Sequence, residues 1–217
     1  MRKSTGALLE VTVLFLLVIG TCRALFLYRS IPFISTTLPL WAAALFLYLP
    51  LLLLFVKKRR PRDWGLTLDR FALSVTAALT VSLVCLPAFL VLYQVYQHIW
   101  FHEVGKITLS SGWLLLLLYH LACIALPEEV FYRGYMQSRL NEGFPSGVRV
   151  LSARLGVGWI YTAVLFALGH YLIDFRLDTL ATFFPGLLFG WLRERTGSVV
   201  APTIFHALCN ATILLVS

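Results

Sequence analysis

The chain has 217 residues, of which 59% are hydrophobic and 13% are charged, and its formal net charge is +8. Soluble domains carry roughly 25% charged residues, so this composition excludes an ordinary soluble protein and predicts a single polytopic membrane domain. The positive charge is concentrated in the run Lys57-Lys58-Arg59-Arg60-Pro61-Arg62. Such a run beside an apolar segment sets membrane topology and meets anionic headgroups, so we expect membrane lipid and not nucleic acid as a partner.

The first half of the chain contains three apolar segments that are long enough to cross a bilayer as helices. They cover residues 7–28, 38–56 and 71–97. The first is predicted to be a retained helix and not a cleaved signal peptide, because its apolar run continues past Arg23. By the positive-inside rule the basic run is cytoplasmic, which places the N-terminus in the cytoplasm and the protein in the cell (cytoplasmic) membrane. Residues 98–111 are predicted to form a polar loop.

Four more helices are predicted in the second half of the chain, at residues 112–140, 151–173, 179–193 and 199–216. The expected fold class is therefore an all-α, polytopic bundle of about seven transmembrane helices, within a range of about six to eight. Residues 1–112 would supply the N-terminal helices and residues 113–217 the catalytic helix core, within one membrane domain.

Two adjacent carboxylates, Glu128 and Glu129, end an almost wholly apolar run. Charged groups are costly in hydrocarbon, so this pair indicates a functional site. Glu129 and Arg133 are four residues apart and share a helix face, so the guanidinium can hold that carboxylate. Glu128 points about 100° away on the helix and is left free for chemistry.

Three further polar side chains lie inside apolar segments: His170, His206 and Asn210. His206 and Asn210 share a helix face, because they are four residues apart. Together with the Glu pair this set fits the hydrolysis of a peptide bond. A free carboxylate can take a proton from water, a histidine can orient that water, and a His-Asn pair can donate to an oxyanion.

The same residue types also fit a metal site. Glu128, His170 and His206 are the kinds of ligand that hold a catalytic zinc with an open water position. Their order differs from the His-Glu-x-x-His motif, and Arg133 already supplies positive charge beside the Glu pair. We therefore favour a mechanism without a cofactor, with zinc as the alternative.

Three motifs in this order resemble those of one known family. Glu128-Glu129-x-x-x-Arg133, Phe166-x-x-x-His170 and His206-x-x-x-Asn210 resemble the motifs of the CPBP family, which contains CAAX prenyl endopeptidases and bacteriocin-processing or immunity proteins. Residues 132–135 and 184–198 are also similar to that family, so the resemblance covers the second half of the chain. Tyr132 stands where many members have Phe.

The resemblance implies an intramembrane endopeptidase that cuts a membrane-associated or lipid-modified protein or peptide. It implies these roles: Glu128 as general base, His170 holding the water, Glu129 and Arg133 in support, and His206 with Asn210 as the oxyanion site. The substrate stays open between a CAAX protein, a bacteriocin leader, a peptide pheromone and a C-terminal sorting signal. The alternative function is a non-catalytic membrane immunity or scaffold protein that binds a peptide partner. A proton-relaying transporter predicts an internal repeat, and the sequence shows none.

One expectation conflicts with the assembly of this site. If the helix that carries Glu128 begins at Trp113 and the helix that carries His170 begins at Leu151, the two side chains differ in depth by roughly 20 Å in a core about 30 Å thick. The motifs therefore predict that one of these helices begins elsewhere, is tilted or is broken.

Overall fold

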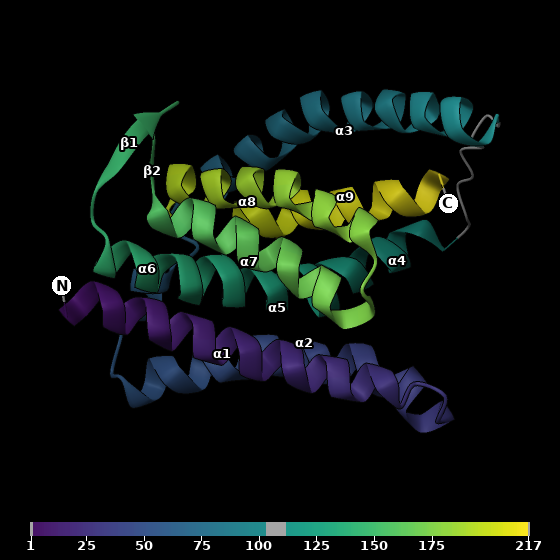
Figure 1. Ribbon diagram of the computed structural model, residues 1–217. Coiled ribbons are helices and arrows are strands. Elements are labelled where there is room, and N and C mark those ends of the chain that lie inside the picture. The colour runs from purple at the N-terminus through teal and green to yellow at the C-terminus, as the bar shows by residue number, and fades with distance from the viewer. Residues whose placement is uncertain (1, 103–111, 217) are drawn as a thin grey trace.

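Two long helices, α1 (Arg2–Leu27) and α2 (Pro32–Val56), form one side of a helix bundle in the computed structural model, which describes residues 2–102 and 112–216 (Figure 1). The buried side chains of α1 recur at helical spacing, at Val11, Phe15, Val18, Ile19 and Cys22. They face the helices of the second half of the chain. The first apolar segment therefore packs into the bundle as an integral helix.

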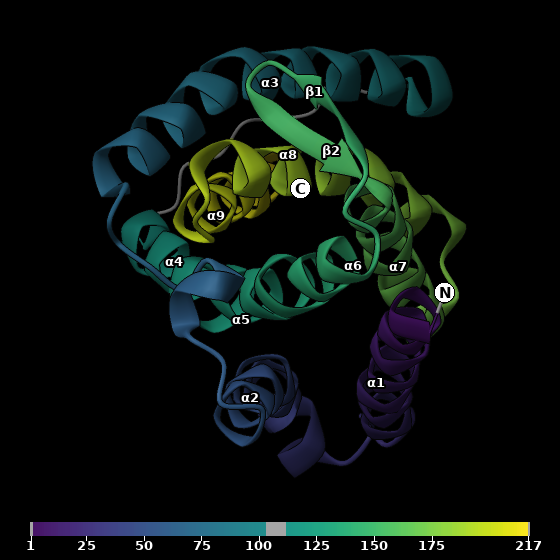
Figure 2. The same cartoon turned by 90° about the vertical axis from the view of Figure 1, so that its left-hand side faces the viewer.

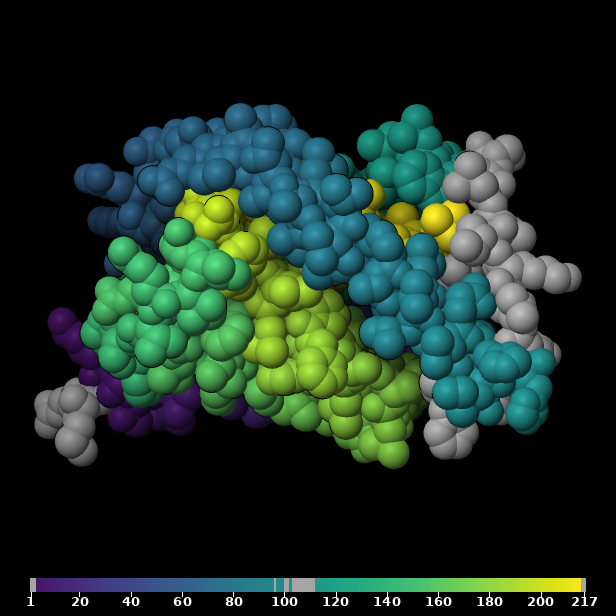
Figure 3. Space-filling model, turned by 90° about the horizontal axis from the view of Figure 1, so that it is seen from above, coloured from purple at the N-terminus to yellow at the C-terminus, as the bar shows by residue number. Residues whose placement is uncertain are grey.

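The opposite side of the bundle is covered by α3 (Phe71–Phe101), which lies over two C-terminal helices, α8 (Phe183–Thr196) and α9 (Val200–Val216) (Figure 3). The outer surfaces of α2 and α3 are apolar and exposed, with Phe55 80% and Leu83 79% accessible. Apolar surface of this extent suits lipid and not water.

Five helices are long and apolar enough to cross a membrane, and a sixth, Val200–Leu215, is shorter. The predicted all-α polytopic bundle is confirmed, and the chain is an integral membrane protein. The count differs from the predicted seven because α8 has only 14 residues, which is about 21 Å of helix against a core of about 30 Å.

A continuous helical rod runs through the centre of the bundle from Trp113 to Gly143. We call it the central helix. Its parts are α4 (Trp113–Tyr119), the π-helical η2 (His120–Ala125), α5 (Leu126–Glu129), the π-helical η3 (Val130–Gln137) and α6 (Ser138–Gly143). Pro127 has no N–H to give to the preceding turn, and the wider π turn lies there. The two carboxylates thus stand between two π-helical segments.

The predicted start of the next helix at Leu151 is wrong. A β-hairpin occupies this place, with β1 (Gly147–Val150) paired antiparallel to β2 (Ala153–Gly156), and α7 (Val157–Asp174) begins only after it. Alternating Val148 and Val150 favour a strand. The two-residue turn places Leu151 and Ser152 at φ 46° and 68°, which is the left-handed conformation of a tight hairpin turn.

A charged link follows α7, before the 3₁₀ segment η4 (Leu177–Thr182) leads into α8. Arg176 forms a two-point ion pair with Asp178, and both side chains are exposed. Hydrogen bonds from Arg176 lower the pKa of the Asp178 carboxyl, so the pair stays charged. At the same level Arg23 of α1 donates to the carbonyl of Ile173, and a cavity of about 670 Å³ lies between the ends of α1 and α7.

The first two helices begin earlier than predicted, at Arg2 and Pro32, and the remaining boundaries agree with the sequence within about four residues. The third helix continues to Phe101, so the predicted polar loop begins later, and its residues 103–111 lie outside the described part of the chain. The short 3₁₀ segment η1 (Pro61–Trp64) connects the basic run to α3, with Trp64 buried against Tyr135. The division of the chain at residue 112 stays a prediction.

Candidate active site

Glu129 and Arg133 form the buried ion pair that their spacing predicts. Arg133 Nη1 donates to Glu129 Oε1 at 3.1 Å, and both side chains are 0% exposed. The same carboxylate oxygen lies 2.9 Å from His206 Nδ1 of α9. A carboxylate that is paired with a guanidinium is ionised and only accepts, so His206 Nδ1 carries the proton in this bond. Glu129 thus fixes the orientation of the His206 ring.

Arg133 is also held from the side of α8. Its Nη2 donates to the carbonyl of Gly186 at 3.1 Å. Its guanidinium lies over the ring of Phe166 at 4.4 Å and over that of Phe189 at 5.1 Å, both within the range of cation–π attraction. Phe189 in turn stacks on the His206 ring, with centroids 4.7 Å apart. Aromatic rings therefore enclose this charged cluster.

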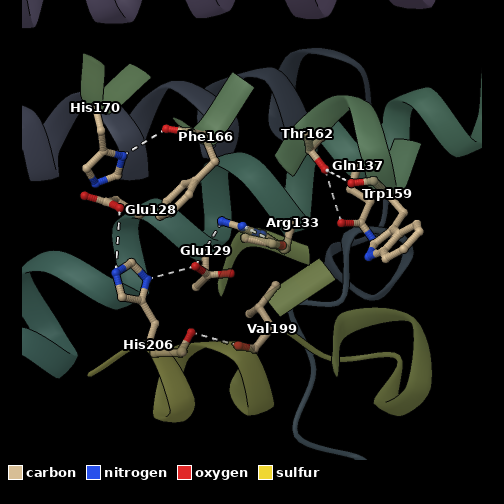
Figure 4. Close-up of polar contacts among 12 residues, drawn as sticks. Glu128, Glu129, Arg133, Gln137, Trp159, Thr162, Phe166, His170, Val199 and His206 are labelled. Carbon is tan, nitrogen blue, oxygen red and sulfur yellow. Dashed lines mark hydrogen bonds and ion pairs between the residues drawn. The ribbon is translucent and has the colours of Figure 1, made fainter. Parts of the chain in front are cut away.

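Glu128 is the free carboxylate of the pair. Its Oε2 is buried and accepts no hydrogen bond from the described residues, and His206 Nε2 stands 3.9 Å from it. Figure 4 shows the Glu128 carboxylate between the rings of His170 and His206. The predicted pairing of Glu129 with Arg133 is present, and the availability of Glu128 for chemistry stays a prediction.

His170 joins the cluster from α7. Its Nδ1 lies 2.9 Å from the carbonyl oxygen of Phe166, and because a carbonyl only accepts, this nitrogen carries the proton. In the neutral ring Nε2 then keeps a lone pair. The Phe166 ring touches both histidines, with centroid distances of 4.6 Å to His170 and 5.8 Å to His206.

Glu128 and His170 can lie at the same depth because both helix boundaries differ from the prediction. The central helix continues to Gly143, and α7 begins only at Val157. The central helix extends about 22 Å from Glu128 to Gly143, and α7 extends about 20 Å from Val157 to His170 at 1.5 Å per residue. Gly158, at the start of α7, packs against Asn141 near the end of α6. The two helices therefore start from the same level and bring both side chains to one depth.

Asn210 is not brought into the cluster by any hydrogen bond or ion pair within the described residues. It is half-buried on α9, one turn after His206. The part that it was expected to play beside His206 stays a prediction.

The side chains do not form a ready metal site. Within residues 2–102 and 112–216, no group of three or more His, Cys, Asp or Glu side chains has an arrangement that could hold a metal ion. Of the three expected zinc ligands, His206 donates Nδ1–H to Glu129 and keeps Nε2 on the side of Glu128, so Nε2 is the nitrogen that a metal would use.

One polar residue near the cluster was missed from the sequence. His120 lies on the central helix, and its ring is within electrostatic reach of His206. The signal was available, because a histidine in an apolar run is the feature that singled out His170 and His206.

A comparison with protein families matches residues 110–212 to the model of the Rce1-like type II CAAX prenyl endopeptidases. Comparisons with curated proteins and with solved structures gave no match. The family match covers every motif on which the sequence resemblance rests, and it confirms the predicted family. It indicates a protease whose substrate is a membrane-associated peptide or protein. Residues 110–212, which contain the buried Glu-Arg-His cluster, thus match the CPBP family of CAAX-type intramembrane endopeptidases.

Proposed function

We propose that this protein hydrolyses a peptide bond with a water molecule that Glu128 activates. The observation that carries the proposal is the difference in environment between the carboxylates of Glu128 and Glu129. Glu129 is 0% exposed and is held through Oε1 by both Arg133 and His206, although its Oε2 has no partner among the described residues. Glu128 has 15% of its side chain exposed and accepts no hydrogen bond from the described residues, so it is the carboxylate of the pair that a water molecule can reach.

The reaction follows from the positions of the neighbouring groups. Glu128 takes one proton from water, the resulting hydroxide attacks the scissile carbonyl carbon, and His170 Nε2 holds the water beside the carboxylate. When the tetrahedral intermediate collapses, the C–N bond breaks and the protonated Glu128 returns the proton to the leaving nitrogen. Water is consumed and Glu128 is regenerated as a carboxylate.

The tetrahedral intermediate carries a negative charge on its oxygen, and a hydrogen-bond donor is needed to stabilise that charge. His206 is suited to this role in its doubly protonated form, because the Glu129 carboxylate stabilises the imidazolium and Nε2–H points to the side of Glu128. Asn210, one turn further along α9, is the second proposed donor and would have to turn toward the substrate when it binds. Arg133 keeps Glu129 ionised and positioned.

We propose that no metal takes part, because Arg133 supplies the positive charge that balances the Glu pair, and no three His, Cys, Asp or Glu side chains among the described residues are arranged to hold a metal ion. We also propose that the protein lies in the cell membrane with its N-terminus in the cytoplasm. The start of α1 and the basic run share one end of the bundle, where Lys57 pairs with Glu10. The positive-inside rule assigns that end to the cytoplasm.

The test is cleavage of membrane-anchored peptides by the purified protein in detergent. A library would include prenylated CAAX peptides, leader peptides and C-terminal sorting signals, so the peptides that are cut identify the substrate class. Wild type should cut at least one class, and Glu128→Gln should abolish cleavage while the melting temperature stays unchanged. Cleavage that survives in Glu128→Gln would refute the assignment of the base. An uncut library, with a biological effect that Glu128→Gln preserves, would favour a non-catalytic binding protein.

A further inference from the structure

His120 carries an unsatisfied nitrogen at a place that no motif covers. Its ring is partly accessible, but Nδ1 is buried and has no hydrogen-bond partner among the described residues. A buried polar atom without a partner costs stability, so each such atom in a native structure needs an explanation, and a bound ligand that supplies the missing hydrogen bond is one. The only described ring that packs edge-on against it is that of Tyr119, at 5.6 Å, which offers no hydrogen bond.

The π-helical segment η2 brings His120 to the side of the central helix that carries Glu128. In a regular α-helix of 3.6 residues per turn, the eight residues between them make about 2.2 turns, and the side chains point about 80° apart. A π-helix has i→i+5 hydrogen bonds and therefore more residues per turn. Because His120 to Ala125 are π-helical, each of these residues turns the chain by a smaller angle than in an α-helix. The angle of about 80° is reduced accordingly, and the side chains of His120 and Glu128 come close to one face of the central helix.

The position relative to α9 supports the same conclusion. Segment η2 packs against α9, the helix that carries His206. His206 faces Glu128 at 3.9 Å, and α5, which carries Glu128, packs against the same helix, so His120 and Glu128 both lie on parts of the central helix that contact α9.

We propose that His120 binds the backbone of the peptide substrate, as a hydrogen-bonding residue beside the catalytic cluster. This inference rests on the proposed endopeptidase function. His120 lies about 12 Å from Glu128 along the helix axis, and an extended chain advances about 3.3 Å per residue. A peptide that lies along the central helix therefore meets His120 roughly three to four residues from the scissile bond, on the side toward Trp113. The ligand class is an extended peptide segment with free backbone carbonyl and N–H groups.

The test replaces His120 by Leu, Asn and Gln and measures the kinetics with the peptide that wild type cuts best. Asn can reproduce the Nδ1 hydrogen bond and Gln the Nε2 hydrogen bond, whereas Leu can make neither. The matched control is His98→Leu, which changes an exposed histidine on α3. Dissociation constants for the same uncut peptide, measured in the Glu128→Gln background, separate binding from chemistry, and melting temperatures report folding.

His120→Leu should raise KM and the dissociation constant about tenfold, with a small change in kcat. A tenfold change corresponds to the free energy of about one hydrogen bond. Either Asn or Gln should restore most of the affinity, and His98→Leu should behave as wild type. Unchanged KM and affinity in His120→Leu would overturn the inference, and so would a loss that accompanies a lower melting temperature and is not rescued by either amide. If wild type cuts no peptide at all, the proposed function fails first, and the inference falls with it.

Discussion

Arg133 of the central helix donates a hydrogen bond to the backbone carbonyl of Gly186 on α8, at 3.1 Å. This bond joins the helix that carries both carboxylates to the helix whose Phe189 stacks on His206. The same guanidinium holds Glu129 through a different nitrogen. Arg133 therefore fixes the position of the Glu129 carboxylate relative to α8.

Arg133→Lys should lower both stability and activity, although the charge is conserved. A lysine ammonium cannot span the Glu129 carboxylate and the Gly186 carbonyl with the geometry of a planar guanidinium. Arg133→Ala leaves the buried Glu129 with His206 as its hydrogen-bond partner but without its guanidinium, and should cost about 3–5 kcal/mol of stability. Unfolding in mixed micelles measures both effects. Arg176→Ala, in an exposed ion pair, is the control and should change stability by about 1 kcal/mol or less.

The substitution His206→Asn tests the roles of the two ring nitrogens of His206 separately. The Asn amide can still donate to Glu129 from the Nδ1 position, but nothing replaces Nε2 on the side of Glu128. The variant should fold with a melting temperature near that of wild type and lose about 10²–10³ in kcat, the typical value of one oxyanion donor. Retention of kcat within a factor of about three would exclude an oxyanion role for His206.

Glu10 anchors α1 to the central helix and should be important for stability. Its carboxylate accepts hydrogen bonds from the Tyr135 hydroxyl at 2.9 Å and from Arg139 Nε at 3.1 Å, and it pairs with Lys57. Tyr135→Phe removes one of these bonds and should cost about 1 kcal/mol. The same substitution in a Glu10→Gln background should cost clearly less, and a double-mutant cycle of unfolding free energies measures the difference. Equal costs in both backgrounds would show that the two groups are not coupled.

Gly158→Ala should be destabilising because α7 packs tightly on the central helix there. An added Cβ would meet the Asn141 side-chain oxygen and, at 2.8 Å, the backbone oxygen of Gln137, which cannot move away easily. Overpacking of this kind costs about 1–3 kcal/mol. Gly20→Ala in α1 is the matched control, because nothing lies within 4 Å of its added Cβ. Gly20→Ala should be neutral or slightly stabilising. Melting temperatures of Gly158→Ala and Gly20→Ala, each compared with wild type, measure the difference.

Treatment with a chelator should leave peptide cleavage unchanged, and added zinc should not raise it. The reason is the positive charge of Arg133 beside the Glu pair, together with the lack of a metal-holding group of side chains within the described residues. Elemental analysis of active protein provides a second measurement. One equivalent of zinc per chain, together with loss of activity on chelation, would contradict the prediction.

The helices and the clamped carboxylate could be predicted from the sequence because both depend on local spacing. Apolar runs define the spans, and Glu129 and Arg133 meet because they are four residues apart. The contact between His206 and Glu129 joins positions far apart in the chain, so no local pattern indicates it. The hairpin was missed because Leu151 and Ser152 are not the glycines or asparagines that usually occupy its turn. The π-helical segments were missed because hydrophobic periodicity does not report the hydrogen-bond pattern of the backbone.

The charged link after α7 places a solvated group close to the candidate site. Arg176 and Asp178 are exposed and ionised, and such a pair in a membrane protein requires solvent around it. His170 precedes Asp174 by a single helical turn, which is about 6 Å. In the proposed hydrolysis each bond that is cut would consume one water molecule, and the solvated link would be a source of water one turn of α7 away from His170. The two ends of the bundle therefore differ in chemistry: one carries the basic run, and the other carries a solvated ion pair next to the candidate site.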